Sequence, residues 1–161
     1  MRNRIIAIVT LILFLPFLSM GKETDPDLGN AVRTVRAFYQ FHFKHDMGFI
    51  EKTIRQKQRW FEPNFYRLLL EEAKRGTAST DEAPDLEGDP FTNSQEYPDT
   101  FQVGKAVRSG EQVNVEVIFI WKHEKRKGQV LLVKQNNIWL ISNIIHDDFD
   151  LLKFLNRTDK S

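Results

Sequence analysis

The segment from Gln112 to Ile145 constrains the fold more than any other part of the sequence. Apolar residues alternate there with other side chains, and this period of two is typical of a half-buried strand. The apolar face of the first run consists of Val113, Val115, Val117, Phe119 and Trp121. A second β-rich run follows at 130–133 and a third at 138–145, with Asn136 and Asn137 between them. The pattern predicts three antiparallel strands joined by two turns.

Helical patterns precede this region. The first helix is expected to begin at Asp27 or Asn30, because these residues can cap it. Its apolar residues recur at spacings of three and four: Val32, Val35, Phe38, Tyr39 and His42 or Phe43. A second helix is predicted after Gly48, with a solvated charged face between Glu51 and Arg59. A third is predicted from Pro63 to Arg75, ending at a left-handed Gly76.

The remaining elements complete a single domain. A further strand is predicted at 100–107, and a short helix at 149–155 that Asp147 or Asp148 could cap. Helices followed by a meander of strands indicate an α+β fold, with the helices packed on one face of a curved antiparallel sheet. The 161 residues, of which 41% are hydrophobic, are enough for one core. We therefore expect one domain over residues 22–161.

The first residues have the pattern of a secretory signal peptide. Two arginines precede an apolar run from Ile5 to Leu18, and Ser19 and Gly21 provide small side chains for cleavage. We expect residues 1–21 to be removed and the mature protein to be periplasmic or secreted. The alternative is an uncleaved anchor, but the run is shorter than the roughly 20 residues of a spanning helix. We therefore expect no membrane span after cleavage.

The charge balance disfavours nucleic acid as a partner. Removal of residues 1–21 takes away two arginines and no acidic residue, so the formal net charge of +1 becomes −1. A nearly neutral chain lacks the basic surface that neutralises phosphates. The absence of cysteine excludes disulfides, thiolate chemistry and lipid attachment after the signal. No glycine-rich phosphate loop or serine nucleophile motif occurs, and no cofactor is predicted.

Two parts of the sequence resemble known families. The run from Asn137 to Ile144, a tryptophan followed by alternating aliphatic residues, resembles the last strands of the nuclear-transport-factor-two-like (cystatin-like) cone fold. The loop motifs Gly88-Asp89-Pro90-Phe91 and Gln95-Glu96-Tyr97-Pro98 resemble an uncharacterised family of exported bacterial proteins, catalogued as domain of unknown function 3828. The resemblance covers residues 31–155 and implies a cone-shaped sheet and an envelope location. It implies no activity, because related cones serve as isomerases, dehydratases, dimerisation modules and binding proteins.

The loop from Thr77 to Tyr97 has no periodicity and is long for a compact domain. We expect Phe91 and Tyr97 to anchor it, and Asp89 to accept backbone hydrogen bonds in a turn. The predicted binding residues are Tyr39, Asp89, Phe91, Gln95 and Tyr97.

The same loop matches the ligand spacing of a calcium loop. Oxygen-bearing side chains fall at positions one, three, five, nine and twelve: Asp85, Glu87, Asp89, Asn93 and Glu96. Position six must turn with a left-handed residue, however, and the ring of Pro90 prevents that conformation. A solvated acidic loop, in which Asp89 has a structural role, is therefore preferred over a metal site.

Histidines and carboxylates at the ends of two elements are a second candidate for chemistry. His42 lies near the end of the first helix, and His146 and Asp147 follow the last strand. A cone could bring them together as an acid–base pair, with a tyrosine as hydrogen-bond donor. Solvated or capping residues of the same types are the alternative. Zinc held by His42, His45 and His146 has less support, because the sequence shows no partner that would orient the imidazoles.

These features predict an exported, non-catalytic binding or interaction protein. Its partner is expected to be a protein, a peptide or a small apolar ligand, and a toxin-neutralising immunity role is one concrete form. The acidic loop from Asp81 to Glu96 would then face a basic site on the partner. The alternative is a small isomerase- or dehydratase-like enzyme that uses His42 or His146 in the cone pocket.

Overall fold

The computed structural model describes residues 25–45, 47–78, 86 and 88–157. The expected signal peptide at 1–21 lies outside the described residues, as do Asp85 and Glu87 of the predicted calcium loop. The first element of the described chain is a helix, and the last is a short helix that follows the sheet.

Four antiparallel strands form one open sheet in the order β1-β2-β3-β4. Their bounds are Thr100–Ser109 (β1), Gln112–Ile120 (β2), Lys125–Gln135 (β3) and Ile138–His146 (β4). Each strand pairs with the next one along the chain. Asn136 and Asn137 have φ values of 49° and 63°, the left-handed conformation that a two-residue hairpin turn requires. The predicted antiparallel strands are confirmed.

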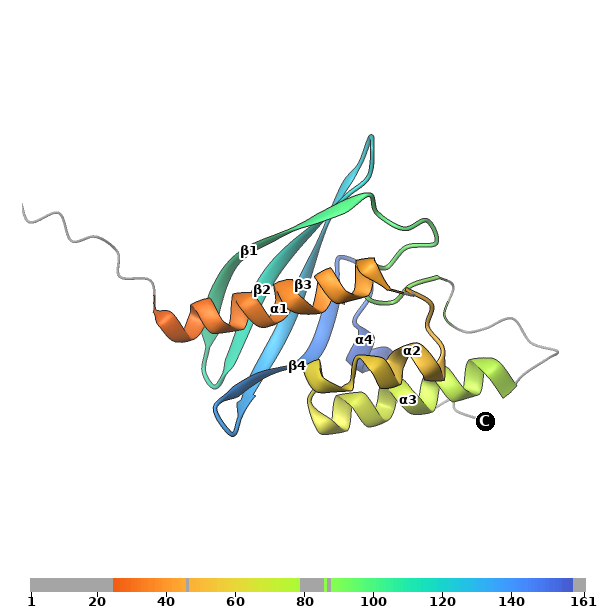
Figure 1. Cartoon of the computed structure of the whole chain (residues 1–161), viewed down its shortest axis with the longest axis horizontal. Coiled ribbons are helices and arrows are strands. Elements are labelled where there is room, and N and C mark those ends of the chain that lie inside the picture. The colour runs from red at the N-terminus through yellow and green to blue at the C-terminus, as the bar shows by residue number, and fades with distance from the viewer. Residues whose placement is uncertain (1–24, 46, 79–85, 87, 158–161) are drawn as a thin grey trace, which may run out of the picture.

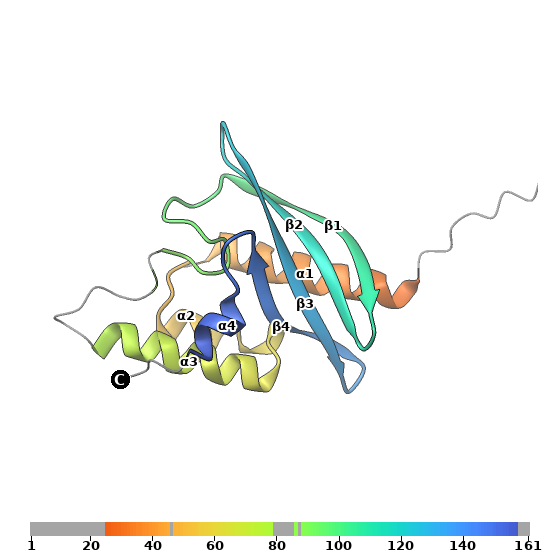
Figure 2. The same cartoon turned by 180° about the vertical axis from the view of Figure 1, so that it is seen from behind.

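The helices pack beside and across this sheet. Their bounds are Pro26–Lys44 (α1), Glu51–Gln56 (α2), Pro63–Ala78 (α3) and Leu151–Leu155 (α4), with a 3₁₀ turn η1 at Gln58–Trp60. Figure 1 shows α1 lying across one face of the strands, with α2 and α3 beside the β4 end. Seen from behind, β1, β2 and β3 lie in front of α1 and no helix covers them (Figure 2). This arrangement confirms the α+β class. None of the described helices is long and apolar enough to cross a bilayer.

The core lies between α1 and the sheet face turned toward it. The alternation predicted for β2 is visible in its burial, since Val113, Val115, Val117 and Phe119 are fully buried and the residues between them are half-buried. Helix α1 contributes Val35, Phe38 and Tyr39, which are also fully buried. Trp139 of β4 is only 3% exposed, as expected of a core residue.

Three helix boundaries differ from the predictions. Helix α1 is capped by Asp25, whose side chain accepts a hydrogen bond from the Asp27 amide, rather than by Asp27 or Asn30. Helix α3 continues through Gly76 to Ala78, because a glycine inside a helix costs only about 1 kcal/mol. Helix α4 is capped by Asp150 instead of Asp147 or Asp148. Two backbone hydrogen bonds between His146 and Phe149 hold the intervening aspartates in a turn, so the helix begins after them, at Leu151.

The charged face predicted from Glu51 to Arg59 is interrupted at Lys57. This residue ends α2 and is fully buried, with its ammonium nitrogen 5.8 Å from the centre of the Phe91 ring. The α2–η1 break turns the position inward, which the helical period of the sequence does not predict.

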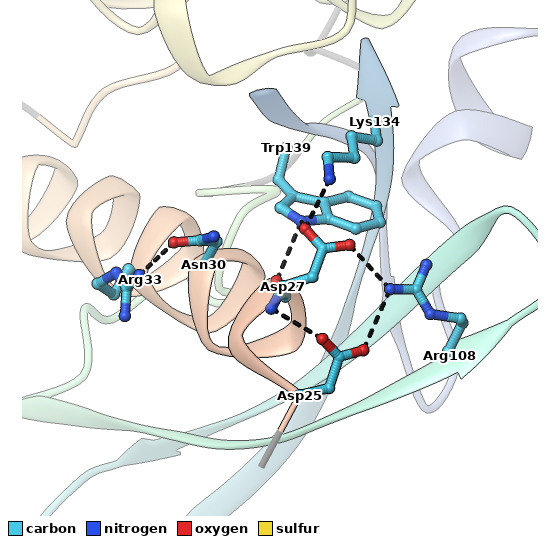
Figure 3. A network of polar contacts seen from close by, with 7 residues as sticks. All are labelled: Asp25, Asp27, Asn30, Arg33, Arg108, Lys134 and Trp139. Carbon is cyan, nitrogen blue, oxygen red and sulfur yellow. Dashed lines mark hydrogen bonds and ion pairs between the residues drawn. The ribbon is translucent and has the colours of Figure 1, made fainter. Parts of the chain in front are cut away.

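A polar network joins the start of α1 to the sheet (Figure 3). The carboxylate of Asp27 accepts hydrogen bonds from Arg108 of β1 at 2.9 Å, from Lys134 of β3 at 2.8 Å and from the Trp139 indole of β4 at 3.0 Å. These donors, Lys134 first, lower the pKa of Asp27 to about 2. One helix residue thus connects three strands to α1.

Candidate functional site

The loop that leads into β1 is held from inside by Asp89. One carboxylate oxygen, Oδ2, lies 2.8 Å from Nε2 of His42 and accepts the Thr92 hydroxyl at 2.6 Å. The other accepts the Phe91 amide at 3.1 Å, the turn bond predicted from the sequence. Gly88 has a φ of 90°, and a Cβ there would lie 2.4 Å from the Ser94 carbonyl oxygen. Only glycine fits this turn.

Phe91 anchors the loop in the core. Its side chain is fully buried, and its ring centre lies 5.4 Å from that of Phe38 and 5.2 Å from that of His42. Its carbonyl accepts the hydroxyl of Tyr39 at 2.9 Å. Burial raises the pKa of Tyr39 well above its usual value, so the hydroxyl stays protonated and donates this bond.

Three of the predicted binding residues are therefore internal. Tyr39 and Phe91 are fully buried and Asp89 is 2% exposed, so no partner can contact their side chains. They shape the loop instead of forming its surface.

The predicted acid–base pair is not assembled in the proposed form. His42 is paired with Asp89 and not with Asp147, which is exposed. His146 is also buried, and its pKa is lowered chiefly by that burial. Neither histidine lines the groove described below. Nδ1 of His42 and Nε2 of His146 are buried without a hydrogen-bond partner among the described residues.

The described residues of the predicted metal sites do not gather around a common centre. His45 is exposed and stacks on Phe41 at 4.1 Å, away from the other two histidines of the predicted zinc set. Within the described residues, no group of three or more His, Asp or Glu side chains could hold a metal ion. Of the predicted calcium ligands, Asp89 already bonds His42 and Thr92, while Asn93 donates to Asp148.

An open groove of about 810 Å³ lies on the outer side of the loop, between residues 93–99 and the turn that joins β2 to β3. We call it the loop–hairpin groove. Its lining residues are Asn93, Ser94, Gln95, Glu96, Tyr97, Asp99, Trp121, Lys122, His123, Glu124 and Arg126. Gln95 and Tyr97, the other two predicted binding residues, are exposed on this surface. Tyr97 is 47% exposed, so the expectation that it anchors the loop as a buried apolar group is wrong, and Pro98 is buried instead.

Side chains that form the walls of the groove also bond the hairpin to the loop. The indole nitrogen of Trp121 donates to the Glu96 carbonyl at 2.9 Å, which links the hairpin to the loop. The guanidinium of Arg126 lies 5.1 Å from the Trp121 ring and forms an ion pair with Glu124. The hairpin half of this groove was missed by the sequence reasoning, although the dense charges from Lys122 to Lys127 were a signal for it.

The groove combines exposed aromatic surface with charges of both signs. Aromatic residues and arginine are enriched at protein interfaces, where a few such side chains provide most of the binding energy. Lys122 and Lys125 make no ion pair with any described residue, and they leave the hairpin end positively charged. An open surface of this kind fits a polypeptide segment better than a small molecule, which usually requires a more enclosed cavity.

Comparisons with known proteins give matches only at the level of the fold. No protein-family model matches the sequence, and comparison with curated proteins gives no significant match. A chain in the selenomethionine crystal structure of the type VI effector–immunity complex Tae3-Tai3 from Ralstonia pickettii is similar, with a TM-score of 0.55 and 20% sequence identity. The match covers 73% of this chain and 96% of that chain. The native structure of the same complex matches with a TM-score of 0.53 and 19% identity, over 75% and 95% of the two chains.

Proposed function

We propose that this protein is an exported immunity-type protein, which binds a toxic effector protein and neutralises it. The observation that carries the proposal is the fold match to one chain of the effector–immunity complex Tae3-Tai3. The match covers nearly the whole of that chain. We prefer the immunity role to the effector role, because the two candidate catalytic histidines, His42 and His146, are buried in the core and do not line the open groove. The binding surface in this proposal is the loop–hairpin groove.

The form of the groove supports a protein partner. Tyr97 and Trp121 provide aromatic contact surface in the groove. Lys122 of the groove and Lys125 at the start of β3 provide positive charge, and neither forms an ion pair with a described carboxylate. Charged groups at the rim of an interface accelerate association and select the partner, while aromatic groups contribute affinity. The expectation of an acidic loop facing a basic partner is replaced in this proposal by a basic hairpin end facing an acidic partner surface.

We further propose that the sheet belongs to the cystatin-like cone class and that the chain is related to the exported family whose motifs it resembles. Residues 88–98 support this, because the Asp89-Pro90-Phe91 motif forms the internal anchor of the loop. Export to the periplasm or the medium is part of the same proposal and rests on the pattern of residues 1–21.

The proposal is tested by contact competition in the producing organism. A strain lacking this gene should be killed by its parent when both grow in contact, and the gene supplied in trans should restore survival. The protein that co-purifies with the mature chain should be toxic when expressed alone and harmless when co-expressed with it. Equal survival of the deleted strain and its parent would refute the proposal.

The contribution of the groove is tested with two substitutions on its rim. Tyr97→Ala combined with Lys122→Glu should abolish protection while the protein stays folded, because both side chains are exposed. Lys153→Glu makes the same charge change on α4 and should protect like the wild type. Protection that survives the groove substitutions would place the interface elsewhere.

A further inference from the structure

The two edges of the sheet differ in whether other parts of the chain cover them. The β4 edge is covered by the chain itself, because the Glu62 amide donates to the Ile141 carbonyl at 2.8 Å and Ile145 bridges to Asp150. No described residue pairs with the outer edge of β1, which is ten residues long. An edge strand presents unpaired N–H and C=O groups at every second residue, a template for another strand.

A groove runs beside the first half of this edge. It has a volume of about 430 Å³ and lies between α1 and β1, where it is lined by Arg36, Gln40, Phe101, Gln102 and Val103. Phe101 and Val103 are opposite Phe119 and Val117 in the β1–β2 register, so they are on the sheet face that packs against α1. A strand added to β1 would place every second side chain over this groove.

The charge of the groove indicates which kind of added strand would bind there. Arg36 is exposed on α1, lines the groove, and forms no hydrogen bond or ion pair with any described residue. A second copy of the chain would bring a second Arg36 to the same edge, which is unfavourable. An extended segment with a carboxylate among apolar side chains complements both the charge and the apolar floor.

We propose that the Thr100–Val103 half of β1 binds an extended acidic peptide segment by strand addition, with its alternate side chains in the Arg36–Phe101–Val103 groove. The bulge after Val103 ends the regular register, so the added strand is limited to this half. Arg108 in the other half is already bonded to Asp25 and Asp27. Backbone hydrogen bonds provide the affinity of such a complex and the groove provides its specificity. The site is separate from the loop–hairpin groove, and its test does not depend on the proposed function.

The test is a selection of random dodecapeptides displayed on phage, with the mature protein as target. Selected peptides should alternate apolar and acidic residues, and their synthetic forms should protect the outward-facing amides among residues 100–103 from hydrogen exchange. N-methylation of alternate peptide residues should abolish binding in one phase of the alternation and not in the other. That dependence on phase is specific to strand pairing.

Matched variants separate recognition from folding. Arg36→Glu should weaken an acidic peptide at least about tenfold and should bind the version with lysine in place of its acidic residues. Lys52→Glu, the same change of charge on an exposed face of α2, should leave affinity within about twofold. The inference is overturned by a selection that yields no peptide protecting 100–103, by peptides that map to the Trp121 groove, or by a wild-type dimer that pairs through β1.

Discussion

His42 and Asp89 lie 47 positions apart in the chain, and their side chains meet at 2.8 Å with neither exposed to solvent. The pair fixes the loop before β1 to the end of α1. The same aspartate accepts the Thr92 hydroxyl and the Phe91 amide, so one carboxylate satisfies three donors. Buried polar groups of this kind are costly only when a partner is removed.

Removal of the Asp89 carboxylate should therefore destabilise the whole domain. Asp89→Ala removes the acceptor of three donors, of which only Thr92 has another partner, the Ser94 hydroxyl, and it should lower the free energy of unfolding by about 2 to 4 kcal/mol. The exposed Asp147→Ala is the control and should change it by less than about 0.5 kcal/mol. Urea denaturation measures both values, and equal small losses would show that the loop is not held by this carboxylate.

Phe91 and Tyr97 should respond differently to truncation, although they belong to the same loop. Phe91→Ala removes a fully buried ring and should cost about 3 to 5 kcal/mol. Tyr97→Ala should cost at most about 1 kcal/mol, because nearly half of the side chain is exposed. A larger loss at Tyr97 than at Phe91, measured by chemical denaturation, would contradict the placement of both.

Trp139 combines a packing role with a hydrogen bond, and two substitutions separate them. Trp139→Ala should lower the free energy of unfolding by about 3 to 5 kcal/mol. Trp139→Phe keeps an aromatic ring but removes the indole donor to Asp27, and it should cost about 0.5 to 1.5 kcal/mol beyond the lost packing volume. Repeating the second substitution in an Asp27→Asn background should give a smaller loss, which thermal denaturation would detect.

Asp27 should contribute to acid unfolding in a defined pH window. Its pKa is about 2 in the folded protein against an ordinary value of 3.8, so folding favours the ionised form. The stabilisation is complete above the ordinary value and is lost as the pH falls from about 4 through about 2. The unfolding midpoint of Asp27→Asn should therefore vary less across this window than that of the wild type. Parallel curves for the two proteins would exclude this contribution.

His146 should reduce stability on acidification in a higher pH range than Asp27 does. Burial lowers its pKa below the ordinary value of 6.5, against the opposing effects of the Pro90 carbonyl and Asp89, so the unfolded chain binds the proton more tightly. Stability is therefore highest above pH 6.5 and declines as the pH falls from that value toward the folded pKa. His146→Gln should flatten this slope, whereas His123→Gln, an exposed change, should retain it. A slope that persists in His146→Gln would assign it to another group.

The elements of this fold could be predicted because their signals are local. The alternation from Val113 to Phe119 and the Asn136-Asn137 turn are set by the strand period and by left-handed backbone geometry, and neither depends on distant residues. The core position of Trp139 follows from the same period. Boundaries were less accurate, since Asp25, Asp27 and Asn30 are all suitable caps and only packing selects one of them.

The candidate sites depended on contacts between distant residues, which a single sequence does not encode in any spacing. Asp89 could be recognised as a turn residue, but its pairing with His42 and the burial of Lys57 arise only when α1, α2 and the loop pack together. The loop–hairpin groove likewise forms because Trp121 reaches the Glu96 carbonyl across 25 positions. Local periodicity thus determined which strands and helices form, whereas tertiary packing decided which polar residues became internal supports and which remained on the surface.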